Sequence, residues 1–203
     1  MEKIEDMYNY VSKTPSDINE HIPTLYKYAT ECESVFETGV RGCISSWALV
    51  KGLMHNCKSS RRIILNDITS CPIDSLLDAT KDVDIDVKFK WINNLNLELV
   101  DNVDLTFIDT WHVYGQLKRE LAKFAPRTNK YIIMHDTTVD EVYGETIRSG
   151  GNPVEQSRES GIPVKEITCG LWPAIEEFLA EHPEWTIRER FTNNNGLTVL
   201  ARV

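Results

Sequence analysis

Acidic and histidine side chains stand at the ends of two apolar runs, where they could bind a metal and move a proton. Asp109 and Asp136 each end such a run, His135 precedes the second acid, and His112 follows the first by three residues. Hard divalent cations prefer carboxylate oxygens, and a histidine with a pKa of about 6.5 can accept a hydroxyl proton near neutrality. Each residue also has a simpler interpretation, because strand-end aspartates often cap helices and His135 could be a packed core residue.

The segment 37–45, ETGVRGCIS, could bring the backbone close to a ligand. Gly39 and Gly42 follow a short apolar run, and the helix start after them would offer free N–H groups. A dinucleotide site has the pattern Gly-x-Gly-x-x-Gly, which is incomplete here, and Glu37 would repel a pyrophosphate. The Glu37 carboxylate would suit a cation such as the ammonium group of an amino acid. The alternative is a tight turn that binds nothing.

Asp67 ends the next apolar run of the chain. An acid in this position can accept both hydroxyl groups of a ribose, as in nucleotide-binding βαβ units. It could equally cap the turn that follows. Together with Glu37, Asp67 favours a ligand that combines adenosine with an amino-acid tail.

Apolar runs alternate with amphipathic stretches, which indicates an α/β protein. We predict strands over 34–38, 61–68, 85–92, 103–109, 130–136, 185–192 and 197–203, and helices over 16–32, 44–56, 72–83, 113–125 and 170–183. Apolar strands between amphipathic helices form parallel sheets covered on both faces, and the turn at 193–196 contains the Asn-Gly signal of a hairpin. We therefore expect a Rossmann-like, doubly wound, seven-stranded sheet, mostly parallel with an antiparallel C-terminal hairpin. Ligands bind such sheets at the carboxyl ends of the strands.

The length of 203 residues suits one domain, spanning 1–203. Residues 1–33 should form N-terminal helices. Residues 137–168 are rich in Gly, Pro, Ser and charge and show no clear period, so we expect a lid or an acceptor-binding loop there.

Composition excludes several classes of protein. The net charge is −9, which would repel a nucleic acid, and the local basic cluster of Lys58, Arg61 and Arg62 is typical of a solvated turn. Five cysteines without a Cys-x-x-Cys pair indicate small buried side chains rather than a zinc site. No membrane span or signal peptide is visible, so a cytoplasmic location is expected.

Several segments together resemble the class I S-adenosylmethionine-dependent methyltransferases. The similarity is strongest to the branch that includes the rhamnosyl O-methyltransferase and cephalosporin hydroxylase-like proteins. The segments are ETGVRGCISSWAL (37–49), FIDTWHVYGQLKREL (107–121), YIIMHDTT (131–138), and GLWPAIEEFLAEHPEW with NNNGLTVL within 170–200. The resemblance spans the chain from Glu37 to its end, and it implies methyl transfer from S-adenosylmethionine to a hydroxyl group.

The resemblance also implies where the cofactor binds. Gly39 would hold its methionine part, Glu37 would lie near its ammonium group, and Asp67 would hold its ribose. The predicted cofactor-binding residues are Glu37, Gly39, Arg41, Gly42, Ser45, Asp67 and Asp109. Cys43 stands where many of these enzymes have the last glycine of the motif.

The metal-dependent, catechol-type members of this superfamily bind Mg²⁺ through two aspartates that match Asp109 and Asp136. They place an Asn after the second aspartate, where this chain has Thr137, so Thr137 and His135 are candidates for the third ligand. Their catalytic base is a Lys three residues after the first aspartate, where this chain has His112. The resemblance therefore implies a divalent metal, Mg²⁺ or alternatively Mn²⁺, with His112 and Asp109 as the catalytic residues.

Aromatic and amide side chains could bind the acceptor. We predict a substrate site made of Trp111, His135, Trp172, Asn193 and Asn194. Trp rings can stack on sugar faces and Asn amides can bind sugar hydroxyls. The simpler interpretations are core packing for the tryptophans and hairpin geometry for the asparagines.

Three functions stay open on the sequence. The first is O-methylation of a sugar, such as a rhamnose-like residue of a glycan. The second is O-methylation of another small molecule, such as a catechol or an antibiotic precursor. The third is a nicotinamide-binding or non-enzymatic Rossmann protein, which the missing glycine and Glu37 disfavour. The expected partner is a small-molecule or glycan acceptor, and residues 1–12 could close its site or pack a homodimer.

Overall fold

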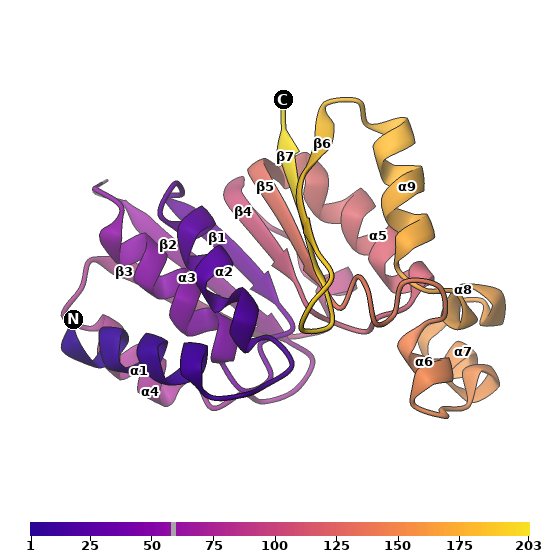
Figure 1. Cartoon of the computed structure of the whole chain (residues 1–203), viewed down its shortest axis with the longest axis horizontal. Helices are drawn as coiled ribbons and strands as arrows, with labels where there is room; N and C mark the ends of the chain where they lie inside the picture. The colour runs from indigo at the N-terminus through magenta and orange to yellow at the C-terminus, as the bar shows by residue number, and fades with distance from the viewer. Residues whose placement is uncertain (58–59) are drawn as a thin grey trace.

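The computed structural model describes residues 1–57 and 60–203, which form one seven-stranded sheet between two layers of helices (Figure 1). The strands are β1 (Ser34–Thr38), β2 (Arg61–Asp67), β3 (Ile85–Trp91), β4 (Val103–Ile108), β5 (Thr128–His135), β6 (Trp185–Phe191) and β7 (Leu197–Arg202). Their order is β3-β2-β1-β4-β5-β7-β6, with β7 antiparallel to both of its neighbours and the other pairs parallel. The predicted fold class is confirmed.

Neighbouring side chains of the central strand point into different cores. Val35 of β1 packs into the cluster beneath α1 (Glu2–Lys13), α2 (Ile22–Ala29), α3 (Ile44–His55) and α4 (Asp74–Thr80). Phe36 points the other way and meets Phe124, with 4.9 Å between ring centres. That opposite face is covered by α5 (Tyr114–Phe124) and α9 (Trp172–Glu181). Every residue of β1 and β4 is buried, as expected of strands covered on both faces.

The strand order reverses between β1 and β4. The chain adds β2 and β3 on one side of β1, and then returns to place β4 and β5 on the other. The loops after β1 and β4 therefore leave the sheet in different directions, and the crevice between them is the usual ligand site of such folds.

Three short helices occupy the segment after β5, where the sequence shows no period. They are α6 (Glu145–Arg148), α7 (Pro153–Ser160) and α8 (Val164–Thr168), and they lie together beyond the strand ends (Figure 1). The first and last are shorter than one apolar repeat, and α7 buries no residue, so none carries an amphipathic signal. A role of this segment as a lid stays a prediction.

Two predicted helices are shorter than expected. The helix predicted over 16–32 begins only at Ile22, after a 3₁₀ turn at Asn19–His21, and has Pro23 in its first turn. The helix predicted over 72–83 is α4, which starts two residues after Pro72. Two further 3₁₀ turns lie at Asn94–Asn96 and Ala125–Arg127.

The described residues of the basic cluster, Arg61 and Arg62, bond to nearby backbone carbonyl groups. Arg61 donates to the carbonyl groups of Met54 and Asp84, and Arg62 donates to that of Asn102. Lys58 lies outside the described residues.

The cysteines are free thiols. Cys32 and Cys43 are buried as predicted, whereas Cys57 is exposed. In the ranges 1–57 and 60–203, no helix is long and apolar enough to cross a membrane.

Lys51 of α3 contacts the N-terminal helix α1 through an ion pair and a cation–π contact. Its Nζ lies 2.7 Å from Glu5 Oε2 and 3.7 Å from the ring centre of Tyr8, and its side chain is only 11% exposed. We expect Lys51→Met to lower the free energy of unfolding by about 1–2 kcal/mol, because the cation–π contact and the ion pair are both lost. Urea unfolding measures this change. Lys81→Met is the control, since its ion pair with Asp78 is exposed and should add nothing measurable. Equal shifts for both variants would contradict the prediction.

Candidate cofactor cavity and metal site

Gly39 joins the loop after β1 to the loop after β4. Its φ is +90°, and a Cβ atom built on it would lie 1.8 Å from the carbonyl oxygen of Asp109. The Gly39 N–H donates to the Asn66 carbonyl at 2.9 Å, and the Asp109 N–H donates to the Thr38 carbonyl at 2.9 Å. Only glycine permits both this backbone angle and this close approach. The ends of β1, β2 and β4 are thereby held together at the switch point.

A cavity of about 620 Å³ opens beside this contact. Such a volume suits a small-molecule or cofactor site. The residues that line it are Thr38, Gly39, Arg41, Asn66, Asp67, Ile68, Thr69, Asn93, Asn94, Asp109, Thr110, Trp111, Gln116, Gln156, Glu159 and Ser160. Of the predicted cofactor-binding residues, the structure brings Gly39, Arg41, Asp67 and Asp109 to this cavity, and α7 supplies its outer wall.

Glu37 lies beneath the glycine loop rather than on the cavity wall. It is fully buried, and its carboxylate accepts hydrogen bonds from the hydroxyl groups of Ser45 and of Ser46, the latter at 2.6 Å. Burial raises the pKa of Glu37 to about 7, and the two serine hydroxyls only partly offset it. Ser45 and Gly42 are likewise absent from the cavity lining. Glu37 would therefore attract an ammonium group in the cavity through its negative charge, from beneath the loop.

This raised pKa makes a pH-dependent prediction for a ligand with an ammonium group. Below pH 7 Glu37 gains a proton, and its attraction for a cation is lost. We expect the affinity for S-adenosylhomocysteine to rise with pH up to about 7, by at most about tenfold per pH unit, and then to level off. Calorimetric titrations between pH 5.5 and 8.5 measure this profile. The Glu37→Gln variant should show a flatter one, and equal slopes in both proteins would refute the assignment.

Asp67 organises the loops and also faces the cavity. Its Oδ2 accepts the Arg41 N–H at 2.9 Å, and its Oδ1 accepts the Thr69 N–H at 2.8 Å and the Thr69 hydroxyl at 2.9 Å. Burial alone would raise the pKa of Asp67, but these hydrogen bonds hold it below its usual value. The carboxylate is thus ionised and keeps capacity for a further hydroxyl donor. Asp67 therefore caps a turn and also lines the cavity, and its binding of ribose hydroxyls stays a prediction.

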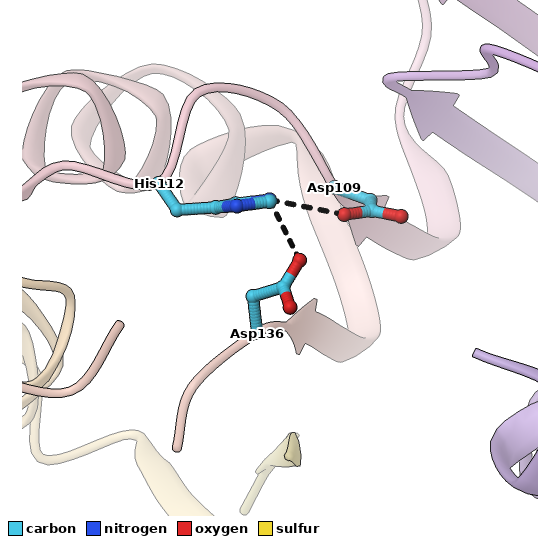
Figure 2. A group of neighbouring side chains, drawn as sticks. All are labelled: Asp109, His112 and Asp136. Carbon is cyan, nitrogen blue, oxygen red and sulfur yellow. Dashed lines mark hydrogen bonds and ion pairs between the residues drawn. The ribbon is translucent and has the colours of Figure 1, made fainter. Parts of the chain in front are cut away.

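Asp109, His112 and Asp136 meet at the ends of β4 and β5 (Figure 2). His112 Nε2 lies 3.1 Å from Asp109 Oδ1 and 3.1 Å from Asp136 Oδ2. His135 Nδ1 approaches the same two carboxylate oxygens, at 3.4 Å and 3.2 Å. Asp136 adopts a left-handed φ of +57°, which turns the chain at the strand end. The structure therefore brings together four of the five residues that the sequence selected for metal binding and proton transfer, and the fifth is Thr137.

Opposite charges balance in this cluster. Burial alone would raise the pKa of Asp109, but His112 and His135 hold it far below its usual range. Burial alone would lower the pKa of His135, yet Asp109 and Asp136 raise it to about 10. Burial likewise opposes the charged form of His112, whose pKa is nevertheless raised well above its usual value by Asp109, Asp140 and Asp136. Both imidazoles thus carry a second proton that a bound cation would displace.

The donor set fits a divalent cation. Asp136 Oδ1 is buried and makes no hydrogen bond, which is the state expected of a ligand atom that awaits an ion. His135 Nε2 donates to the Asn194 carbonyl at 3.3 Å, as the outer nitrogen of a metal-ligating histidine usually does. The Thr137 hydroxyl instead pairs with that of Thr198 at 2.9 Å. Between the two candidates for the third ligand, this geometry favours His135.

The predicted acceptor residues separate in space. Trp111 lines the cavity. Trp172 stacks against the guanidinium of Arg190, at 3.5 Å from the ring centre, and donates its Nε1–H to Glu176 at 2.8 Å. It is absent from the cavity lining, so the structure does not bring Trp172 to the cavity.

Asn193 and Asn194 hold the N-terminal segment. The Asn194 amide donates to the Ser16 carbonyl at 2.8 Å and accepts the Glu20 N–H at 3.0 Å, and the Asn193 amide donates to Glu20. Buried His21 bonds to the carbonyl groups of both asparagines. The hairpin turn packs onto 16–21, so neither amide lines the cavity.

Sequence reasoning missed a polar network behind the cavity. Buried Glu120 Oε1 accepts hydrogen bonds from Thr110 at 2.6 Å, Gln116 at 2.8 Å and Asn94 at 2.5 Å. A signal existed, because Gln116 and Glu120 stand four residues apart on the side of a predicted helix that packs inward. Asp140, which contacts His112, was also missed, since it falls in a segment with no period.

No family model and no curated protein matches the chain, but many solved structures share its fold. The O-methyltransferase from Bacillus cereus, in complex with S-adenosylhomocysteine, has a TM-score of 0.64 at 14% identity over 100% of this chain and 91% of that one. The O-methyltransferase TomG from Streptomyces achromogenes, involved in tomaymycin synthesis and solved with S-adenosylmethionine, has a TM-score of 0.63 at 12% identity, covering 100% and 90%.

The N-methyltransferase NodS from Bradyrhizobium japonicum is also similar, with a TM-score of 0.55 at 14% identity over 92% of this chain and 96% of that one. At such identities the similarity establishes the Rossmann-like methyltransferase fold. Because this fold occurs in enzymes named for O- and for N-methylation, the chemistry has to be argued from the site.

Proposed function

We propose that this protein is an S-adenosylmethionine-dependent O-methyltransferase that acts on a hydroxyl group of a sugar, such as a rhamnose-like residue of a glycan. The position of Asp109 carries the proposal. It lines the 620 Å³ cavity and also belongs to the cluster with His112 and Asp136. A methyl donor in the cavity and a hydroxyl group at the cluster would therefore meet at one residue.

The residues of the cluster have separate roles in this proposal. Asp109, Asp136 and His135 would hold a divalent cation, which supplies Lewis-acid stabilisation of an alkoxide when bound. His112 would accept the hydroxyl proton at Nε2 once a bound cation has displaced the second proton of its ring. Gly39 and Asp109, which lie in contact, would set the direction from which the acceptor oxygen approaches the methyl group of the donor. Such alignment can contribute several orders of magnitude in rate. Trp111 lines the cavity beside it and would help exclude water.

The charges of the cavity wall favour a neutral acceptor. The cavity lining contains three acids, Asp67, Asp109 and Glu159, and one basic residue, Arg41. The Arg41 guanidinium is already paired with Asp17 at 2.6 Å. An acceptor with phosphate groups, such as an acyl-coenzyme A, would meet net repulsion. A neutral sugar with two adjacent hydroxyl groups has no such penalty and offers two oxygens to the cation.

O-methylation of a non-sugar small molecule, such as a catechol or an antibiotic precursor, is the second candidate. The similarity to TomG, an enzyme of tomaymycin synthesis, favours it, and the Trp111 ring on the cavity wall would suit a planar acceptor. A catechol also presents two adjacent hydroxyl groups. The two candidates therefore share the donor and the metal and differ only in the acceptor.

Calorimetric titration with S-adenosylhomocysteine, with and without Mg²⁺ and with NAD as the control, tests the common part. Micromolar binding of the first ligand without binding of NAD is the expected result. Transfer of a labelled methyl group to methyl α-rhamnoside or to catechol then separates the candidates. A protein that fails to bind S-adenosylhomocysteine under both conditions would overturn the proposal.

A further inference from the structure

Glu120 anchors the polar network behind the cavity. Its side chain is buried, and its Oε1 accepts three hydrogen bonds, from Thr110, Gln116 and Asn94, whereas its Oε2 accepts none from the described residues. An ionised carboxylate can only accept, and one that carries a proton on Oε2 still accepts at Oε1. The three neighbouring groups must therefore turn a donor toward Glu120 in either charge state of the acid.

The far end of the network imposes the same direction on the hydrogen bonds. Asn94 Nδ2 donates to Glu120 and to the Thr38 hydroxyl at 2.9 Å, and that hydroxyl donates to Asn66 Oδ1 at 2.9 Å. The Asn66 amide nitrogen donates to two backbone carbonyl groups around the end of β3, each at 2.8 Å. Because groups that can only accept stand at both ends, reversing any amide in between would set two acceptors against each other.

Gln116 is left with only its carbonyl oxygen for the cavity. Its Nε2 donates both protons, to Glu120 Oε1 at 2.8 Å and to Asn94 Oδ1 at 3.1 Å. Its Oε1 is not sealed inside the protein, no described residue donates to it, and the side chain lines the cavity. The Thr110 hydroxyl, which also lines the cavity, donates its single proton to Glu120 at 2.6 Å. Both groups therefore offer a ligand acceptors and no donor.

The sheet order places Gln116 beside the half of the cavity that lies away from the metal cluster. Gln116 bonds to Asn94, which follows β3, and β3 pairs with β2, whose last residue is Asp67. The cluster lies at the ends of β4 and β5, on the other side of β1. A methyl donor whose ribose binds Asp67 and whose methyl group lies at Asp109 would therefore extend its purine toward Gln116.

We infer that Glu120 is a positioning residue that turns the carbonyl oxygen of Gln116 into the cavity, so that Gln116 selects a 6-aminopurine over a 6-oxopurine. The inference rests on the proposed function, in which the cavity binds S-adenosylmethionine. The amino group of the purine donates to Gln116 Oε1, whereas a carbonyl oxygen in its place faces a second acceptor. Sites that hydrogen-bond an N–H group reject an analogue without it by several orders of magnitude, because a buried acceptor stays unpaired.

Calorimetric titration with S-adenosylhomocysteine and with S-inosylhomocysteine, its 6-oxo analogue, measures this selectivity. Wild type should bind the inosine compound at least about 100-fold more weakly than the adenosine compound. The ratio of the two affinities is taken on one protein, so a loss of folded material in a variant does not change it. Affinities within about threefold of each other in wild type would overturn the inference, whatever the variants do.

Substitutions separate the oxygen of Glu120 from its charge. Gln116→Met removes the acceptor and should reduce the affinity ratio below about tenfold. Glu120→Met frees the Gln116 amide to turn and should have the same effect. Glu120→Gln keeps an oxygen at the position of Oε1 and should keep the wild-type ratio. If Glu120→Gln lost as much selectivity as Glu120→Met, the positioning role of the Oε1 acceptor would be refuted.

Gln156→Met is the matched control. Gln156 lines the same cavity, but its Oε1 already accepts the Thr146 hydroxyl at 2.7 Å. This variant should therefore keep the wild-type ratio of affinities. An equal fall in Gln156→Met and Gln116→Met would show that selectivity does not depend on the direction of the Gln116 amide, and would contradict the inference.

NMR of protein labelled with ¹⁵N-glutamine tests the amide without any ligand. Gln116 and Gln156 are the only glutamines of the chain, so the spectrum contains two side-chain amides, and Gln116→Met assigns them. The Gln116 amide protons should exchange with solvent at least about tenfold more slowly than those of Gln156, because both bond to buried acceptors. Equal exchange rates would overturn the inference. Failure of wild type to bind either homocysteine compound would instead refute the proposed function, while the amide spectrum still decides how Gln116 is held.

Discussion

Asp136→Asn is expected to abolish divalent-metal binding, with an affinity at least about 100-fold below wild type, while S-adenosylhomocysteine still binds within about threefold. Asp136 contributes a carboxylate to the cluster and is absent from the cavity lining. Even outer-shell substitutions at metal sites cost about 10- to 100-fold in affinity, and this change removes a charged ligand. Turnover that depends on the metal should fall with it.

The variant should fold, because its backbone conformation suits the new residue. Asp136 has a φ of +57°, and asparagine adopts this left-handed region more readily than other non-glycine residues. Manganese titration followed by paramagnetic resonance measures the metal, and calorimetry measures the cofactor product. Asp101→Asn is the control, since that side chain is exposed and outside the cluster. Unchanged manganese affinity in Asp136→Asn would remove the metal assignment.

Gly39→Ala is expected to destabilise the protein by about 3–5 kcal/mol and to lower the affinity for S-adenosylhomocysteine at least about 100-fold. The added Cβ would lie 1.8 Å from the Asp109 carbonyl oxygen and 2.4 Å from its carbon, which are backbone atoms that cannot rotate away. Overpacking costs about 1–3 kcal/mol and a positive φ in alanine costs about 1–2 kcal/mol, and both apply here. The loop must shift, and the cavity wall shifts with it.

Gly150→Ala separates the two causes. Gly150 also has a positive φ, of +72°, but nothing lies within 4 Å of a Cβ built on it. That variant should lose only about 1–2 kcal/mol and keep its affinity for S-adenosylhomocysteine. Urea unfolding and calorimetry on both variants provide the comparison. Equal effects would mean that contact with Asp109 is unimportant.

Topology explains why most of the candidate metal site could be predicted. Asp109, His135 and Asp136 end two strands, and parallel neighbours bring their carboxyl ends to one edge of the sheet. His112 follows within three residues and has little freedom to lie elsewhere. The apolar runs of the sequence were therefore enough to predict that these four residues lie close together.

Side-chain direction and long-range packing were harder to predict. Glu37 was expected near the ligand, but Ser45 and Ser46 from the first turn of α3 bind it beneath the loop. Asn193 has hairpin geometry and also contacts Glu20, a partner 173 residues away along the chain. Asp140 lies next to His112 and pairs with Arg148, which belongs to a short helix without an apolar stripe. Such contacts depend on where loops pack, which periodicity does not encode.

In the proposed function, the contact between Gly39 and Asp109 would couple the binding of the cofactor to the binding of the metal. Asp109 lines the cavity and belongs to the cluster, and one backbone contact joins both loops. The coupling free energy is a single quantity, and each ligand must change the affinity of the other by the same factor. Because S-adenosylhomocysteine is expected to bind Asp136→Asn within about threefold, this shared factor should also stay within about threefold for the metal.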